Sequence, residues 1–214
     1  MPLICPTVLA ADGESYKRQM GRIAHFGHRI QIDLTDGEFA KTTTIKPDEI
    51  WWPVGFKADI HLMYQEPMSA MKATVAKDPH LIIVHAEAGG NFGELAQYCH
   101  DRQVQVGVAL LPATSPELIV KELPYIDHVL IFSGDLGSFG GHADLSLLEK
   151  VSFLKQHKPE LEVGWDGGVN QQNVSELIFG GVDVLNVGGF IQNSEDPEKA
   201  YNSLARIAEE TGTT

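Results

Sequence analysis

Eight short apolar runs, rich in β-branched residues, recur at regular intervals along the chain. Continuous apolar runs are typical of parallel strands that are covered on both faces, whereas strict alternation of apolar and polar residues is typical of strands with one wet face. The predicted strands span residues 3–9, 29–34, 58–63, 81–87, 104–111, 128–133, 161–166 and 182–188. We therefore expect a parallel sheet of eight strands.

Segments with the apolar spacing of helices separate these runs. They span residues 15–26, 67–77, 92–101, 116–123, 145–157, 171–179 and 197–209. Cap signals support two of the starts, Thr114-Ser115-Pro116-Glu117 and Asn170. After the second strand, KTTTIKPDEIWW leaves room only for a short helix around residues 47–51. Regular strand-helix units without a linker predict an α/β fold, a closed (β/α)8 TIM barrel that forms one domain over residues 1–214, with an open doubly wound sheet as the alternative.

Composition limits the classes of partner. A chain of 214 residues that is 43% hydrophobic can bury a sizeable core, and its net charge of −13 repels nucleic acid and anionic membranes. Cys5 and Cys99 lack the spacing of a zinc site, and there is neither an apolar leader nor an uncharged run long enough to span a membrane. We expect a cytoplasmic protein with reduced cysteines and no nucleic-acid or membrane partner.

Polar side chains end several of the predicted strands, at Thr7, Asp33, His61, His85, Ser133 and Asp166. In a barrel these strand ends meet at one mouth, where such folds carry their sites. Asp33, His61 and Asp166 have apolar neighbours, so each needs a metal, a cation or hydrogen bonds. Each one alone could be a helix cap or a core histidine. Together, two acids and an imidazole predict a divalent metal site or a proton-transfer site.

Glycine clusters form a second constellation, in SFGGH (138–142), DGGV (166–169) and VGGF (187–190). Backbone without side chains lets several N–H groups point at one anion, and barrels often bind phosphate with the loops after strands seven and eight. We expect a phosphate on the substrate. The alternative is that these glycines only satisfy tight turns.

Three other features near the mouth have structural interpretations. Asp36-Gly37 is most simply a turn, and Met63 is either an apolar wall of the mouth or a core residue. Trp165 should point outward, beneath the helices, if its neighbour Asp166 points inward.

The motifs resemble the ribulose-phosphate 3-epimerase family over nearly the whole chain. The segments CPTVLAAD, DIHLM, VHAEA, VGVALLPATSPE, WDGGVN and GVDVLNVGGFI are similar to that family's segments and occur in the same order. The resemblance implies a (β/α)8 barrel that interconverts ribulose 5-phosphate and xylulose 5-phosphate. It also implies a homo-oligomer.

By this resemblance, Asp33 and Asp166 are the two catalytic acids, one removing the C3 proton while the other delivers a proton to the opposite face. A divalent metal, commonly zinc, would hold the C2 and C3 oxygens and stabilise the enediolate. Asp33, His61 and Asp166 match three of the family's four metal ligands, and the fourth falls at Gln31, where the family usually has histidine. A neutral carbonyl oxygen is a poorer ligand for zinc but serves harder ions, so manganese, iron or cobalt are the other expectations.

The resemblance also assigns the substrate pocket. Thr7 replaces a serine that hydrogen-bonds substrate, Met63 and His61 adjoin it, and the phosphate site is implied by the glycine pairs Gly140, Gly141, Gly167, Gly168, Gly188 and Gly189.

The chain departs from the family at two further places. Thr35 stands where the family has a methionine that shields the enediolate, and the strand-six loop SGDLGSFGGH is one residue longer and contains Asp135. These departures leave a non-catalytic barrel that binds a sugar phosphate as an alternative. A related decarboxylase or aldolase is disfavoured, because Thr35 occupies the position of the lysine in their Asp-x-Lys-x-x-Asp pattern.

Overall fold

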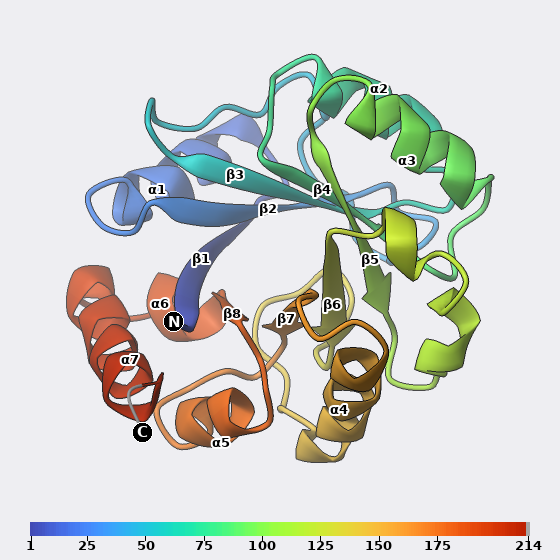
Figure 1. Cartoon of the computed structure of the whole chain (residues 1–214). Coiled ribbons are helices and arrows are strands. Elements are labelled where there is room, and N and C mark those ends of the chain that lie inside the picture. Colours follow the sequence, from blue (N-terminus) through green and yellow to red (C-terminus); the bar gives the residue numbers. More distant parts are fainter. Residues whose placement is uncertain (213–214) are drawn as a thin grey trace.

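Eight parallel strands close into one barrel in the computed structural model, which describes residues 1–212 (Figure 1). Each strand pairs with the next along the chain, and β8 pairs with β1. The strands are β1 (Leu3–Leu9), β2 (Arg29–Thr35), β3 (Lys57–Met63), β4 (Leu81–His85), β5 (Gln105–Leu110), β6 (His128–Phe132), β7 (Glu162–Asp166) and β8 (Val184–Val187). The predicted (β/α)8 TIM barrel is confirmed, and the open sheet is wrong because β1 and β8 close the ring.

The strands bury side chains on both faces. Ile30, Ile32 and Leu34 of β2 and Trp165 of β7 belong to the outer apolar cluster, which lies between the barrel and its helices. A smaller cluster fills the barrel interior: Leu81, Ile83, Ala109 and Leu130. This double burial explains the continuous apolar runs. Trp165 faces outward as expected, which leaves Asp166 on the interior face.

The helices surround the barrel in Figure 1. They are α1 (Gly13–Ile23), α2 (Met68–Val75), α3 (Phe92–His100), α4 (Leu148–His157), α5 (Val174–Phe179), α6 (Gly189–Gln192), α7 (Pro197–Gly212) and the 3-10 helices η1 (Pro116–Ile119), η2 (Leu123–Tyr125) and η3 (Leu145–Leu147). Asp12 and Ser15 form a capping box at the start of α1. Within residues 1–212, no helix is long and apolar enough to cross a membrane.

The short helix expected around residues 47–51 is wrong. The chain makes one turn there, closed by a hydrogen bond from Glu49 N to Lys46 O, and no helix covers this side of the barrel between β2 and β3. The buried side chains of Ile45 and Ile50 cover it instead, and Ile45 N donates to Ala10 O. An extended segment anchored at its apolar residues thus replaces the helix.

Two other helical expectations differ from the structure. An α-helix was expected over residues 116–123, but the chain forms the separate 3-10 helices η1 and η2 there, and Pro124 lies inside η2. The α conformation is disfavoured for a residue that precedes proline, because the proline ring clashes with its backbone. A continuous α-helix is therefore interrupted at this point. The helix expected over residues 171–179 begins only at Val174, because the Asn170 and Asn173 side chains form a turn before it.

A buried ion network closes the end of the barrel opposite the mouth. Arg29 donates from Nε to Asp59 at 2.6 Å and from both terminal nitrogens to Glu162, which also contacts His128 at 2.8 Å. Burial opposes ionisation of Glu162, but hydrogen bonds from His128 and Arg29 outweigh it and hold its pKa well below the usual range. A side chain at Gly164 would come within 2.6 Å of the His128 ring, so glycine makes room for the network.

Removing the cation of this network should destabilise the fold. Arg29→Met leaves the buried Asp59 carboxylate without its arginine partner, and we expect the free energy of unfolding to fall by about 3 kcal/mol. Arg206→Met is the matched control, because Arg206 and Glu210 form an exposed pair 3.9 Å apart. Its effect should stay within about 0.5 kcal/mol. Urea unfolding of both variants measures the difference, and equal losses would contradict this view of the network.

Candidate functional site

An open cavity of about 510 Å³ lies at the mouth formed by the carboxyl ends of the strands. Its lining combines the ends of strands far apart in the sequence with the loops that follow β6, β7 and β8. The predicted residues that line it are Thr7, Asp33, Met63, Gly140, Asp166, Gly167, Gly168, Gly188 and Gly189. The predicted acids and most of the predicted glycines thus share one opening.

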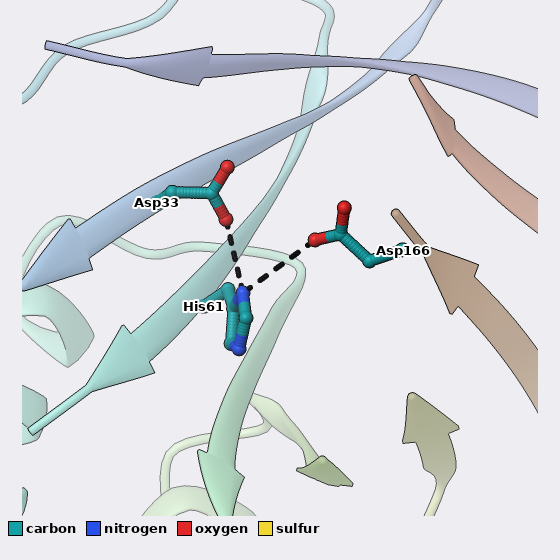
Figure 2. Close-up of side chains that lie close together, drawn as sticks. All are labelled: Asp33, His61 and Asp166. Carbon is teal, nitrogen blue, oxygen red and sulfur yellow. Dashed lines mark hydrogen bonds and ion pairs between the residues drawn. The ribbon is translucent and has the colours of Figure 1, made fainter. Parts of the chain in front are cut away.

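Asp33, His61 and Asp166 converge at the base of this mouth from β2, β3 and β7 (Figure 2). His61 Nδ1 lies 3.0 Å from Asp33 Oδ1 and 3.8 Å from Asp166 Oδ2. One ligand atom from each side chain falls within 4.8 Å of the others. His61 is fully buried, and both carboxylates retain some access to the cavity. The geometry is that of a candidate metal site that opens toward substrate.

Gln31 lies between the two acids. Its Nε2 donates to Asp33 Oδ1 at 2.9 Å and to Asp166 Oδ2 at 2.7 Å, while its buried Oε1 has no partner. Exchanging the amide oxygen and nitrogen by rotation would direct the carbonyl oxygen at the point where the acids meet. The donor set therefore fits a divalent cation, with three anionic or imidazole ligands and one neutral oxygen.

The pKa of the Asp166 carboxyl group is raised. Burial and the nearby charge of Asp33 raise its pKa to about 7, although His61 and the Gln31 hydrogen bond act in the opposite direction. The protonated form of Asp166 is therefore favoured relative to that of an ordinary aspartate. A carboxyl group tuned in this way can serve as a general acid or a general base.

A chain of polar contacts continues from His61 into the barrel wall. His61 Nε2 lies 2.9 Å from His85 Nε2, and His85 Nδ1 lies 3.4 Å from Glu87 Oε2. Burial lowers the pKa of His85 to about 4. Burial opposes the charge on Glu87, but its contact with His85 and the hydrogen bonds from the Thr114 hydroxyl and Leu111 N lower its pKa to about 2. At neutral pH the neutral imidazole of His85 thus lies beside the ionised carboxylate of Glu87.

The glycine clusters lie in tight backbone contacts as well as in the cavity wall. Gly167 (φ 119°) and Gly168 (φ 70°) have backbone conformations that favour glycine, and a side chain at either would come within 2.2 Å of a neighbouring backbone nitrogen. Gly141 does not line the cavity but packs against Gly134. Asp135 lines the cavity, and none of the described lining residues is lysine or arginine. An anion here would depend on backbone N–H groups.

Several residues of this region have no role that was predicted from the sequence. Asn186 on β8 lines the cavity, and its buried Oδ1 has no partner. Its signal was a lone amide in the apolar run VDVLNVG, in register with Asp166. His85 was placed at the mouth without a function, and Glu87 was read only as part of a motif. Asp36 forms a turn as expected, accepting from Glu38 N and Phe39 N.

Comparisons with known proteins agree with this geometry. A sequence model described as the ribulose-phosphate 3 epimerase family matches residues 3–191. The chain is 29% identical over 211 residues to ribulose-phosphate 3-epimerase of Bacillus subtilis, covering 94% of this chain and 97% of that protein. It is 27% identical over 208 residues to ribulose-phosphate 3-epimerase of Schizosaccharomyces pombe, covering 94% and 91%.

Solved structures share the architecture at low sequence identity. The structure of 3-hexulose-6-phosphate synthase from Salmonella typhimurium matches with a TM-score of 0.74 and 11% identity over 99% of this chain and 100% of that one. KGPDC from Streptococcus mutans matches with a TM-score of 0.71 and 10% identity over 99% of both chains. At these identities the likeness shows the fold alone.

Proposed function

The chain belongs to the ribulose-phosphate 3-epimerase family, and on that premise we propose that it inverts C3 of a ketose phosphate. The substrate would be ribulose 5-phosphate and xylulose 5-phosphate, or a close relative. The observation that carries the proposal is the convergence of Asp33 and Asp166 beside His61 at the mouth of the barrel. Two carboxyl groups in one pocket are what an inversion by proton transfer to opposite faces requires.

The two acids divide the proton transfer. In one direction the carboxylate of Asp33 removes the C3 proton, and protonated Asp166 delivers its proton to the opposite face of the planar enediolate. In the reverse direction the roles exchange, so that the net proton count of the protein is unchanged after each inversion. The pKa of Asp166, raised by burial and by Asp33, supports this scheme because it favours the protonated form that delivers the proton.

Asp33, His61, Asp166 and Gln31 would hold a divalent cation in this site. When bound, it supplies charge stabilisation for the substrate oxygens on which negative charge develops. Zinc is the family's usual ion, while the neutral oxygen of Gln31 favours harder ions such as manganese. Elemental analysis of protein purified without chelator identifies the ion.

The rest of the cavity would orient the substrate. The backbone of the loops that contain Gly140, Gly167 and Gly188 would bind the phosphate, with Thr7 donating a hydrogen bond to substrate and Met63 providing an apolar wall. Support for this assignment comes from their shared position in the cavity lining. The oligomeric state stays a prediction.

Exchange of the C3 proton with solvent deuterium tests the function. Protein reconstituted with zinc or manganese is incubated in D2O with a panel of ketose phosphates, and deuterium at C3 is followed by NMR. We expect exchange coupled to inversion for at least one five- or six-carbon member. No exchange with any member of the panel would reject the epimerase function.

A second candidate function is binding of a sugar phosphate without turnover. It is favoured by the Gln31 amide, which satisfies both acids without a cation, and by Asp135 at the cavity. Saturable binding of a ketose phosphate together with no exchange at C3 would support it.

A further inference from the structure

Asn186 is an unpartnered amide in the wall of the cavity. The residue is 2% exposed, and its buried Oδ1 has no hydrogen-bond partner. Several other described side chains have a buried polar atom without a partner, but Asn186 alone among them lines the cavity. Burying an amide oxygen without a partner costs stability, so such a group in a folded protein needs an explanation.

The neighbours of Asn186 in the sheet do not provide the missing partner. Asn186 is in register with Asp166 on β7 and with Cys5 on β1, and side chains in register on adjacent strands face the same side of the sheet. Neither neighbour donates a hydrogen bond to Oδ1, and the rest of β8 is apolar. A molecule in the cavity, water or substrate, is the remaining source of a partner.

An amide can pair with a hydroxyl group in either sense. Its oxygen accepts from the hydroxyl hydrogen, and its NH2 group donates to the hydroxyl oxygen. Rotation of the side-chain amide exchanges the two groups, so Asn186 can present either one to the cavity. Asn186 is the only side-chain amide among the described residues that line the cavity. A substrate hydroxyl, which also donates and accepts, is the matching group.

The position of Asn186 selects the hydroxyl. Its backbone lies one strand spacing, about 4.8 Å, from that of Asp166, and Gly188 follows about 6.6 Å farther along the chain. Under the proposed function, C3 lies at the two acids and the phosphate lies at the loop that contains Gly188. In a five-carbon ketose 5-phosphate, C4 and C5 lie between these groups, and C5 bears the phosphate. The C4 hydroxyl is therefore the one that faces Asn186.

We propose that Asn186 is a specificity residue that hydrogen-bonds the C4 hydroxyl of the substrate. Inversion changes the configuration at C3 and leaves C4 untouched, so a contact at C4 binds both epimers alike. Such a contact selects the sugar without favouring substrate over product. The inference rests on the proposed function, because that function places C3 at the acids, but it concerns a residue that takes no part in proton transfer.

Asn186→Leu keeps the number and branching of the side-chain heavy atoms but cannot hydrogen-bond. We expect KM for ribulose 5-phosphate to rise about 3- to 10-fold, the effect of one lost hydrogen bond. The kcat value should stay within about twofold, because the contact at C4 is the same in the ground state and the transition state. The wild type should bind the 4-deoxy analogue, which lacks the C4 hydroxyl, about 3- to 10-fold more weakly than ribulose 5-phosphate. Asn186→Leu should bind the two ligands equally.

Calorimetric titration of the full chain with each ligand measures these affinities without requiring turnover, and thermal unfolding confirms that each variant is folded. Asn202→Leu is the matched control, because it makes the same replacement at an exposed position of α7. It should match the wild type with both ligands. If leucine overpacks the site and Asn186→Leu does not fold, Asn186→Ala removes the same amide without added volume and takes its place.

A wild type that binds ribulose 5-phosphate and its 4-deoxy analogue equally would overturn the inference. An equal loss of affinity for both ligands in Asn186→Leu would also overturn it, because a merely structural role predicts that result. A preference for ribulose 5-phosphate that disappears in Asn186→Leu, in a protein without exchange at C3, supports the contact and rejects the epimerase function. Exchange at C3 without this preference does the reverse. A wild type that binds neither ligand overturns the inference, and deuterium exchange alone then decides the proposed function.

Discussion

Replacing Asp166 by asparagine is expected to lower kcat for C3 inversion by about 10²- to 10⁴-fold, the range that a general acid or base contributes. The new amide would keep the shape and the contact with Gln31 but could neither take nor release the proton. The same loss is expected for Asp33→Asn. Each variant should retain slow exchange at C3 of only one epimer, the one whose C3 proton faces the remaining acid, because exchange on one face needs only one acid.

Comparison of exchange with inversion separates this result from a general loss of structure. Both rates are measured in D2O on each epimer, with circular dichroism to confirm folding. Asp48→Asn is the control, because Asp48 is an exposed acid on the connection between β2 and β3 and should have wild-type rates. Inversion at more than a tenth of the wild-type rate in both Asp33→Asn and Asp166→Asn would exclude the two-acid scheme.

The barrel could be predicted because the spacing of apolar residues along a strand indicates whether one or both of its faces are buried. Strands buried on both faces are unusual outside parallel α/β folds. Because side chains alternate along a strand, the sequence also predicts whether the polar residue at its end faces the barrel interior or the helices. In β2 the side chains of Ile30, Ile32 and Leu34 face outward, and those of Gln31, Asp33 and Thr35 face inward. The position of Gln31 beside Asp33 could therefore be predicted from the alternation of side chains along the strand.

The helices and loops that cover the outside of the barrel were less predictable, because tertiary contacts determine their conformation. Apolar spacing indicated a helix over residues 116–123 and a short one around 47–51, yet neither α-helix forms. In the first segment, Lys158 Nζ donates to Leu123 O and Ile126 O, which satisfies carbonyl groups without helical bonds. In the second, the Tyr16 hydroxyl donates to Trp51 O. These partners lie some 35 residues away in sequence, beyond the reach of local propensity.

The two acids and the imidazole of the candidate site could be predicted from the sequence, but the contacts that link His61 to His85 and Glu87 could not. VHAEA contains His85 and Glu87 two residues apart, a spacing that by itself indicates only one face of a strand. Their relation to His61 depends on the pairing of β3 with β4, and the donors to Glu87 come from the loop after β5. The proximity of His61, His85 and Glu87 emerges only when all three elements are placed.

Gln31→His is expected to raise zinc affinity by at least about 100-fold, the upper end of what changes to outer partners produce. The variant replaces a neutral amide, which now donates to both acids, with an imidazole nitrogen that zinc prefers to a carbonyl oxygen. Manganese, a harder ion, should gain less, so the preference for zinc over manganese rises. Calorimetric titration of the metal-free protein with each ion measures both affinities.

Thr35→Val is the matched control for this change. Thr35 lies on the same face of β2 as Gln31 and Asp33, and its buried hydroxyl has no partner, so valine alters no donor to the cation. Its affinities for both ions should equal those of the wild type. If Gln31→His binds zinc no more tightly than the wild type, then position 31 is not a ligand position, and the cation would depend on Asp33, His61 and Asp166 alone. If both variants gain zinc affinity equally, the effect comes from strand packing and not from the donor atom.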